Sequence, residues 1–302
     1  MRIGIQTSGI LDMRGIEKGF ELIRDTGFDC VDFNLDPYLS YGDIVSGRLE
    51  SVFTRPLDEL IGFFSPFKQA AERNHVAIGQ MHAPFPSYVK DSPVTNYQLL
   101  EIFKNCIALC EHMDCPRLII HPFFLGYQDK LGLEQEFSLN MESYATLIPS
   151  LQKHNVVVCL ENMFSEYRGK IYSACCSDMH DALRYVDELN ERAGRRSFGF
   201  CLDTGHALLL GLDIEDIILK LGDRLEALHI HDNNGLTDQH IAPYMGILDW
   251  DRFVRGLKAI GYKRDLSFES ANAQRMFDAE LLPQVLALTA ATGRMFARRI
   301  EE

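Results

Sequence analysis

The stretch Phe198-Gly199-Phe200-Cys201-Leu202-Asp203-Thr204-Gly205-His206 decides the fold, because it shows a pattern that recurs along the whole chain. A short apolar run ends on a carboxylate and leads into a segment with helical periodicity. Apolar runs of this kind, each followed by a predicted helix, occur eight times. They cover residues 2–7, 30–34, 76–82, 117–121, 156–161, 198–203, 225–231 and 266–269.

Strands that alternate with helices predict a parallel sheet, because parallel strands need long crossover connections. Helical periodicity follows the apolar runs over residues 16–26, 57–73, 96–112, 141–153, 178–192, 214–221, 250–260 and 279–299. Eight repeats predict a single domain, residues 1–302, folded as a (β/α)8 TIM barrel. An open doubly wound sheet is the alternative, but Ser8-Gly9-Ile10-Leu11 lacks the glycine pattern of a dinucleotide-binding loop. Residues 36–54 are long for a strand–helix connection, and we interpret them as a lid or a partner-contact insertion.

Composition narrows the class of protein. The chain has 30 Lys and Arg against 43 Asp and Glu, a formal net charge of −13. This charge disfavours nucleic acid as a partner, since affinity for DNA comes mostly from basic patches. The apolar runs fall far short of the roughly 20 residues that span a membrane, and the first seven residues read as a strand and not as a signal peptide. The eight cysteines form no C-x-x-C pair, so we expect a reduced, cytoplasmic protein.

Six consecutive predicted strands end on a residue that can bind a metal. In a parallel barrel all strand C-termini lie at one mouth, so these side chains would converge there. Carboxylates and imidazoles that close together would repel one another and lose hydration unless a cation neutralised them. Oxygen and imidazole donors favour Mn²⁺, Zn²⁺, Co²⁺ or Fe²⁺, with Mg²⁺ an option where carboxylates dominate. The six residues are His82, His121, Glu161, Asp203, His231 and Glu269.

Two further groups join this set. His206 follows Asp203 by one helical turn, a spacing that lets both side chains face the same mouth. Asp238 and His240 follow the seventh strand at i and i+2, so in an extended loop they point to one side. Each residue also has a plainer interpretation. A lone carboxylate after a strand often caps a helix, the histidines could only line a substrate cavity, and Asp238 and His240 could only fix their own loop.

Taken together, these motifs resemble the xylose-isomerase-like barrel superfamily, and more narrowly the sugar phosphate isomerase/epimerase proteins, which share their metal site with endonuclease IV. The resemblance covers nearly the whole chain. Its motifs, in order, are Leu160-Glu161-Asn162, Leu202-Asp203-Thr204-Gly205-His206, His229-Ile230-His231-Asp232-Asn233, Asp238-Gln239-His240 and Gly246-Ile247-Leu248-Asp249-Trp250.

The resemblance implies one divalent metal held by Glu161, Asp203, His231 and Glu269. The endonuclease IV type uses additional ligands for a multinuclear zinc cluster, and every such position is filled here, which implies one to three ions. The additional positions are His82, His121, His206, Asp238 and His240. One departure concerns Thr237, which stands where the ketose 3-epimerases of this superfamily carry an arginine; this puts their mode of substrate binding in doubt.

We interpret the protein as an enzyme that isomerises or epimerises a small sugar or polyol ketone by proton transfer next to a carbonyl, through an enediolate. Glu161 and Glu269 would lie on opposite faces of the substrate as the two proton carriers. His206 would bind a substrate hydroxyl or oxyanion. The metal would polarise the carbonyl.

Three alternatives stay open. The first is a zinc-dependent phosphodiesterase of the endonuclease IV type that acts on abasic DNA, which the acidic balance disfavours. The second is an inosose-type dehydratase, which uses the same enolate chemistry but expels water. The third is a sugar-sensing or partner-binding module without turnover, although such a module has no need of two opposed proton carriers. Related barrels often form dimers or tetramers, so homo-oligomerisation is a further expectation.

Overall fold

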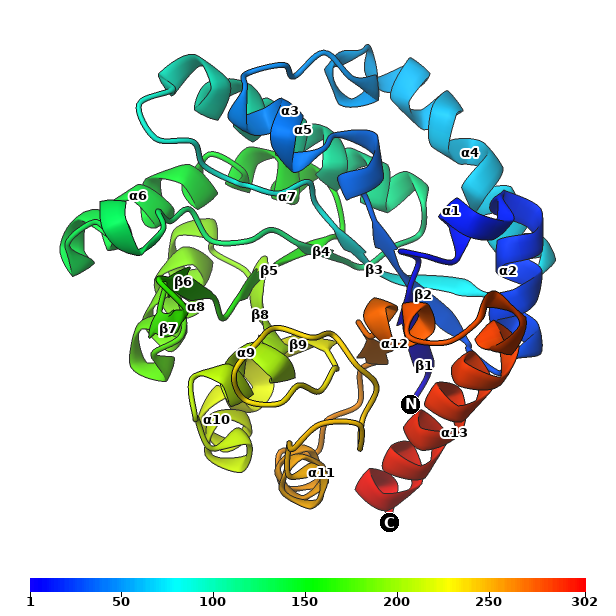
Figure 1. Cartoon of the computed structure of the whole chain (residues 1–302). Helices are drawn as coiled ribbons and strands as arrows, with labels where there is room; N and C mark the ends of the chain where they lie inside the picture. Colours follow the sequence, from blue (N-terminus) through cyan, green and yellow to red (C-terminus); the bar gives the residue numbers. More distant parts are fainter. The chain divides into compact units, whose positions relative to one another are not determined.

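The computed structural model describes residues 1–302, and these divide into two compact units. The first unit contains Met1–Phe33, Phe67–Gly79 and Cys201–Glu302, and the second contains Asn34–Pro66 and Gln80–Phe200. Figure 1 shows the strands and helices with the labels used below. That the chain is one domain stays a prediction.

The first unit holds four complete or nearly complete strands: β1 (Ile3–Gln6), β2 (Cys30–Asn34), β9 (Leu225–His229) and β10 (Leu266–Phe268). Strands β10, β1 and β2 pair in parallel, with Ile3 opposite Leu266 and Gly4 opposite Cys30. A further parallel bridge, between Ile230 and Phe268, joins the end of β9 to β10. The side chains of β1 and β9 are buried throughout, as expected of parallel strands that are covered on both faces.

The second unit holds β4 (Arg117–Ile119) and β5 (Val157–Glu161), and both units share β3 (Ala77–His82) and β8 (Phe198–Asp203). Strands β3, β4 and β5 pair in parallel, with Met81 opposite Leu118 and Leu118 opposite Val158. The sheet order is β10-β1-β2-β3-β4-β5-β8-β9. Strands that follow one another along the chain are thus neighbours in the sheet, which is the connectivity of the predicted (β/α)8 barrel.

The helices connect the strands. In the first unit these are α1 (Leu11–Arg14), α2 (Ile16–Asp25), α9 (Thr204–Leu209), α10 (Ile214–Leu221), α11 (Trp250–Ala259), α12 (Ala271–Arg275) and α13 (Leu282–Glu301). In the second unit they are α3 (Tyr41–Val45), α5 (Pro93–His112), α6 (Leu133–Ala145), α7 (Ile148–Lys153) and α8 (Met179–Ala193), while α4 (Leu57–Arg73) begins there and ends in the first. Helix α11 begins as predicted, with the Asp249 side chain accepting from the Arg252 amide.

In three regions the structure contains more detail than the sequence predicted. The helix predicted over residues 141–153 is two helices, α6 and α7, because Pro149 at the start of α7 has no N–H to continue α6. Residues 36–54, which we interpreted as a lid or a partner-contact insertion, contain α3 and two 3₁₀ turns, Asp36–Tyr38 and Val52–Thr54, and their role stays a prediction. A hairpin follows β5 and was not predicted: β6 (Phe164–Tyr167) pairs antiparallel with β7 (Lys170–Ser173).

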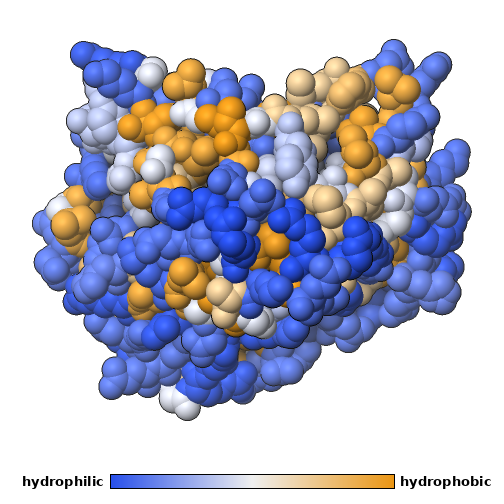
Figure 2. Space-filling view, turned by 90° about the horizontal axis from the view of Figure 1, so that it is seen from below, coloured by the Kyte–Doolittle hydropathy of each residue, from blue (hydrophilic) through white to orange (hydrophobic).

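The hydrophilic surface and the buried cysteines agree with the composition. Figure 2 shows one face on which most residues are hydrophilic, in keeping with the net charge of −13. None of the helices combines the length and the hydropathy that crossing a membrane requires. All eight cysteines are free and buried, where thiols pack as small hydrophobic groups. In the first unit the Met1 amino group lies 2.7 Å from Oε1 of Glu301, in the last turn of α13.

Candidate functional site

The Asp203-Thr204-Gly205-His206 motif anchors the site of the first unit. Asp203 ends β8 and caps α9, because its Oδ1 accepts from the His206 amide at 2.7 Å. Thr204 Oγ1 accepts from the His231 amide at 3.0 Å and donates to the His231 carbonyl at 2.7 Å. A Cβ on Gly205 would stand 1.9 Å from the His231 ring, so only glycine lets that ring approach the start of α9 so closely. The motif therefore fixes both Asp203 and His231.

His231 is held between Asp203 and His240. Its Nε2 lies 2.9 Å and 3.0 Å from the two oxygens of Asp203, and all of these atoms are buried. The ring of His240 stacks on that of His231, with centroids 4.0 Å apart and planes at 11°. His206 stands nearly perpendicular to both rings. One donor atom each of His206, His231, Asp238 and His240 lies within 4.8 Å of the others.

Asp238 and His240 face each other, although they were expected only to share one side of the loop. Their Oδ2 and Nε2 atoms are 2.8 Å apart, and the positive φ of His240 turns its ring back toward Asp238. Burial alone would lower the pKa of His240, but Asp238, Glu269 and Asp203 raise it to about 9. Burial alone would raise the pKa of Asp238, but His206 and His240 hold it well below its ordinary value. The carboxylate therefore stays ionised across the physiological range.

Glu269 belongs to a chain of buried polar groups in the same unit. Gln6 Nε2 donates to Glu269 Oε1 at 2.7 Å, and His229 Nδ1 lies 3.1 Å from Oε2. On its other side, His229 Nε2 lies 3.0 Å from Oδ2 of Asp32, which is fully buried. Asp203, His229 and Glu269 offer donor atoms within 4.8 Å of one another. The orientation of Glu269 thus depends on Gln6, which the sequence did not predict as part of the site, and on His229, which belongs to a predicted motif but not to the predicted ligands.

The second unit brings together the other three predicted residues. His82 Nε2 lies 3.0 Å from His121 Nε2, which lies 3.2 Å from Glu161 Oε2. The two imidazole rings meet edge to face at 4.6 Å. Burial lowers the pKa of His121 although Glu161 and Asp36 act to raise it, so the neutral ring that a metal requires is favoured.

Asp232 organises the loop after β9. It belongs to one of the predicted motifs, but the sequence did not predict this role. This fully buried carboxylate accepts hydrogen bonds from the amides of Asn233, Tyr244 and Leu248, at 2.9, 3.2 and 3.0 Å. It also accepts from the indole Nε1 of Trp250 at 3.0 Å. Asp232 is therefore an internal anchor for the segment that carries Asp238 and His240.

The donors present fit a divalent cation. Nδ1–H of His82 donates to the Ala83 carbonyl at 2.9 Å, and Nδ1–H of His240 donates to the Glu269 carbonyl at 3.0 Å. Metal-bound histidines commonly donate their second N–H in this way, which orients the other nitrogen toward the ion. Asp238 Oδ1 is buried without a hydrogen-bond partner. An orphaned buried carboxylate oxygen is unfavourable unless a cation or a proton donor meets it.

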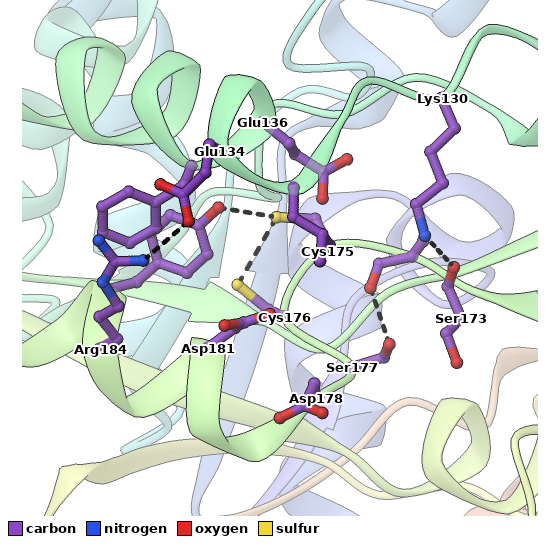
Figure 3. A pocket seen from close by; sticks show the side chains of 14 residues that line it. Lys130, Glu134, Glu136, Ser173, Cys175, Cys176, Ser177, Asp178, Asp181 and Arg184 are labelled. Atoms are coloured by element: carbon purple, nitrogen blue, oxygen red, sulfur yellow. Dashed lines mark hydrogen bonds and ion pairs between the residues drawn. The ribbon is translucent and has the colours of Figure 1, made fainter.

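A separate cavity in the second unit has a different character. It measures about 140 Å³, and Figure 3 shows Glu136, Cys175, Cys176 and Arg184 among its lining residues. The Sγ atoms of Cys175 and Cys176 are 3.9 Å apart, and burial raises the pKa of Cys176 well above its ordinary value. No predicted metal ligand lines this cavity.

Comparison with known proteins agrees with the fold. A family model described as "xylose isomerase-like TIM barrel" matches residues 20–290. The chain therefore belongs to the xylose isomerase-like TIM barrel family, which confirms the predicted resemblance and fold class.

Three relatives show the range of similarity. The uncharacterized protein y4fM of Sinorhizobium fredii is 25% identical over 268 residues, 85% of this chain and 81% of that protein. A D-psicose 3-epimerase of Enterocloster bolteae is 30% identical over 117 residues, 39% of this chain and 34% of that protein. The crystal structure of 3-keto-D-glucoside 4-epimerase YcjR from E. coli superposes with a TM-score of 0.72 at 15% identity, covering 96% of this chain and 99% of that one.

Proposed function

We propose that this protein is a divalent-metal-dependent isomerase or epimerase of a small sugar or polyol ketone. The observation that carries the proposal is that each unit presents one buried or partly buried carboxylate, Glu161 or Glu269, against an imidazole. Two relatives named as sugar epimerases support the substrate class. The free, buried cysteines are consistent with a reduced, cytoplasmic protein.

The residues that would hold the ion come from both units. In a barrel of parallel strands the carboxyl ends meet at one mouth, so we propose that Glu161, Asp203, His231 and Glu269 share an ion. The remaining candidate ligands, for the same or for further ions, are His82, His121, His206, Asp238 and His240. Their donor atoms suit Zn²⁺ or Mn²⁺, with Co²⁺, Fe²⁺ or Mg²⁺ as alternatives. A bound divalent ion acts as a Lewis acid that acidifies the C–H next to a substrate carbonyl.

The carboxylates do the proton chemistry in this proposal. One of Glu161 and Glu269 removes the proton, and the other returns it on the opposite face of the substrate. Glu269 is oriented by Gln6 and His229, and Glu161 lies against His121. His206, at the edge of the first unit's donor group, would bind a substrate hydroxyl. Positioned acid–base groups of this kind contribute roughly 10²–10⁴-fold to the rate.

Solvent exchange tests the proposal. The protein is incubated in deuterium oxide with Mn²⁺ or Zn²⁺ and a panel of keto and aldo sugars, and NMR detects deuterium at carbons next to the carbonyl. We expect exchange with at least one sugar and a fall of about 10²–10⁴-fold in Glu161→Gln and in Glu269→Gln. Full activity in either variant would refute the two-carboxylate mechanism. Formation of a dehydrated product would instead show the inosose-type dehydratase.

A phosphodiesterase of the endonuclease IV type is the second candidate. His206, Asp238 and His240, which are grouped with His231, favour it, because these three offer donors that a single ion on the four principal ligands does not use. The net charge of −13 argues against it. Elemental analysis gives the number of ions, and an abasic duplex reports nicking. Two or three zinc ions per chain together with nicking would favour this candidate over the isomerase.

A further inference from the structure

A second, larger cavity of the second unit lies beside the predicted ligands His82, His121 and Glu161. It measures about 440 Å³, within the range of small-molecule binding pockets. Its walls come from α3 and from the loops that follow β3 and β4. Four aromatic residues line it: Tyr41, Phe85, Tyr88 and Phe124.

One aromatic ring connects this cavity to the candidate proton carrier. Phe85 lies edge to face on His121, with centroids 4.8 Å apart, and His121 Nε2 is 3.2 Å from Glu161. The ring centroid of Tyr41 lies 5.7 Å from that of Phe85. The Phe85 amide donates to Asp36 Oδ1 at 2.9 Å, which fixes the wall in place. A molecule whose reacting carbon reaches Glu161 would therefore have its far end at this aromatic wall.

The cavity also holds an unused polar group. Ser87 lines it and is 2% exposed, and its Oγ is buried without a hydrogen-bond partner. A buried hydroxyl without a partner is unfavourable, so a ligand that brings a hydroxyl group gains from meeting it. Lys90 and Asp129, which form an ion pair, supply a polar edge to the same cavity.

From this arrangement we infer that the substrate is a substituted sugar, with a second ring seated in the cavity lined by Tyr41, Phe85 and Ser87. Flat aromatic walls select a ring with an apolar face, and Ser87 selects a ring that also carries a hydroxyl. A second sugar ring meets both requirements. We therefore expect the enzyme to prefer a keto-glycoside over a free monosaccharide as substrate. This inference rests on the proposed function, since it assigns the far end of the same substrate.

Ligand binding tests the inference without turnover. The full chain with Mn²⁺ is titrated, by calorimetry and saturation-transfer NMR, with methyl β-glucoside, phenyl β-glucoside and the disaccharide cellobiose. We expect both two-ring probes to bind at least about tenfold more tightly than methyl β-glucoside, because only they reach the aromatic wall. Equal binding of all three probes, or no binding of the two-ring probes, overturns the inference.

Matched variants locate the second ring. Tyr41→Ala removes a 58%-exposed tyrosine from the cavity, and Tyr97→Ala removes a 65%-exposed tyrosine of α5 that does not line it. We expect Tyr41→Ala to weaken both two-ring probes roughly three- to tenfold and Tyr97→Ala to leave them unchanged. Ser87→Ala should weaken cellobiose about two- to tenfold and spare phenyl β-glucoside, whose second ring has no hydroxyl. Equal effects of Tyr41→Ala and Tyr97→Ala, or a change of oligomeric state in Tyr41→Ala without a change in binding, overturn the assignment.

The outcomes also separate this inference from the proposed function. Deuterium exchange on free sugars without any preference for a second ring overturns the inference alone. A second-ring preference that Tyr41→Ala removes, without deuterium exchange on any keto-sugar, upholds the cavity and overturns the proposed chemistry.

Discussion

The two donor groups of the molecule are built differently. In the first unit, His231 is clamped through its backbone by Thr204 and through its ring by Asp203 and Gly205, so its position is set by several independent contacts. In the second unit, His121 touches Glu161 and His82 on one side and the aromatic wall at Phe85 on the other. From this difference we expect the first group chiefly to hold the proposed ion and the second chiefly to meet the proposed substrate.

The largest expected effect is on metal affinity, and it compares the donor groups of the two units. We expect His231→Ala to weaken Mn²⁺ or Zn²⁺ binding more than the roughly 100-fold that changes next to a ligand can cost, and His121→Ala to weaken it clearly less. Removing His231 also takes away the imidazole next to the buried Asp203 carboxylate, which keeps the hydrogen bond from the His206 amide, so we expect a loss of about 1–3 kcal/mol in unfolding free energy. Competition with a chelating dye measures affinity, and thermal unfolding measures stability. Equal losses in the two variants would show that the groups are not specialised.

The second prediction tests whether the ring of His231 needs the space at Gly205. The Cβ of Gly205→Ala would overlap a buried ring, so we expect a loss of about 3 kcal/mol in unfolding free energy and weaker metal binding. Gly62→Ala is the matched control, because Gly62 lies in α4 and a Cβ added there would have no neighbouring atom within 4 Å. That change should stabilise the protein by about 0.5–1 kcal/mol. A Gly205→Ala protein as stable as the wild type would contradict the close packing.

A third prediction concerns the chain that orients Glu269. His229→Gln keeps a polar side chain but removes the two ring nitrogens that lie 3.0 Å from Asp32 and 3.1 Å from Glu269. We expect metal affinity to fall about 10–100-fold, as for other residues that orient a ligand, and the melting temperature to fall by a few degrees, because fully buried Asp32 loses its neighbouring imidazole. His180→Gln, on the exposed start of α8, is the control and should change neither quantity. Unchanged affinity in His229→Gln would show that Gln6 suffices to hold Glu269.

The sequence predicted the ends of β3, β5 and β8 at His82, Glu161 and Asp203, whereas β4, β9 and β10 end one or two residues before His121, His231 and Glu269. A period of apolar runs marks the ends of strands, and in a parallel sheet those ends converge, so Asp203 and His231 could be paired from the pattern alone. The role of Gly205 could not be predicted, because it depends on the close approach of a ring from another strand. The same holds for Asp32, which reads as an ordinary residue inside an apolar run, whereas His229 stands in a quoted motif without a predicted ligand role.

Local structure that departs from common patterns was also missed. The β6–β7 hairpin turns at Arg168 and Gly169, both with positive φ, a conformation for which Asn-Gly is the usual signal. Arg168 gives no such signal, so the sequence did not predict the strands on either side of this turn. The helical pattern over residues 141–153 concealed a break at Pro149, since the apolar spacing continues across it. Pattern recognition alone therefore missed both the hairpin and the break.

The smallest expected effect concerns the loop that carries Asp238 and His240. Asp232→Asn replaces one accepting oxygen by a donor, which would face donors already directed at Asp232, among them Leu248 and Trp250. We expect a loss of about 1.5 kcal/mol in unfolding free energy and a red shift in the emission of Trp250, the only tryptophan. Asp251→Asn, an exposed partner of Arg299, is the control and should change stability by less than about 0.5 kcal/mol. If Asp232→Asn leaves stability and emission unchanged, the loop is held by the contacts of Asp238 and His240 and not by this internal anchor, and the first unit's donor group is less preorganised than its hydrogen bonds indicate.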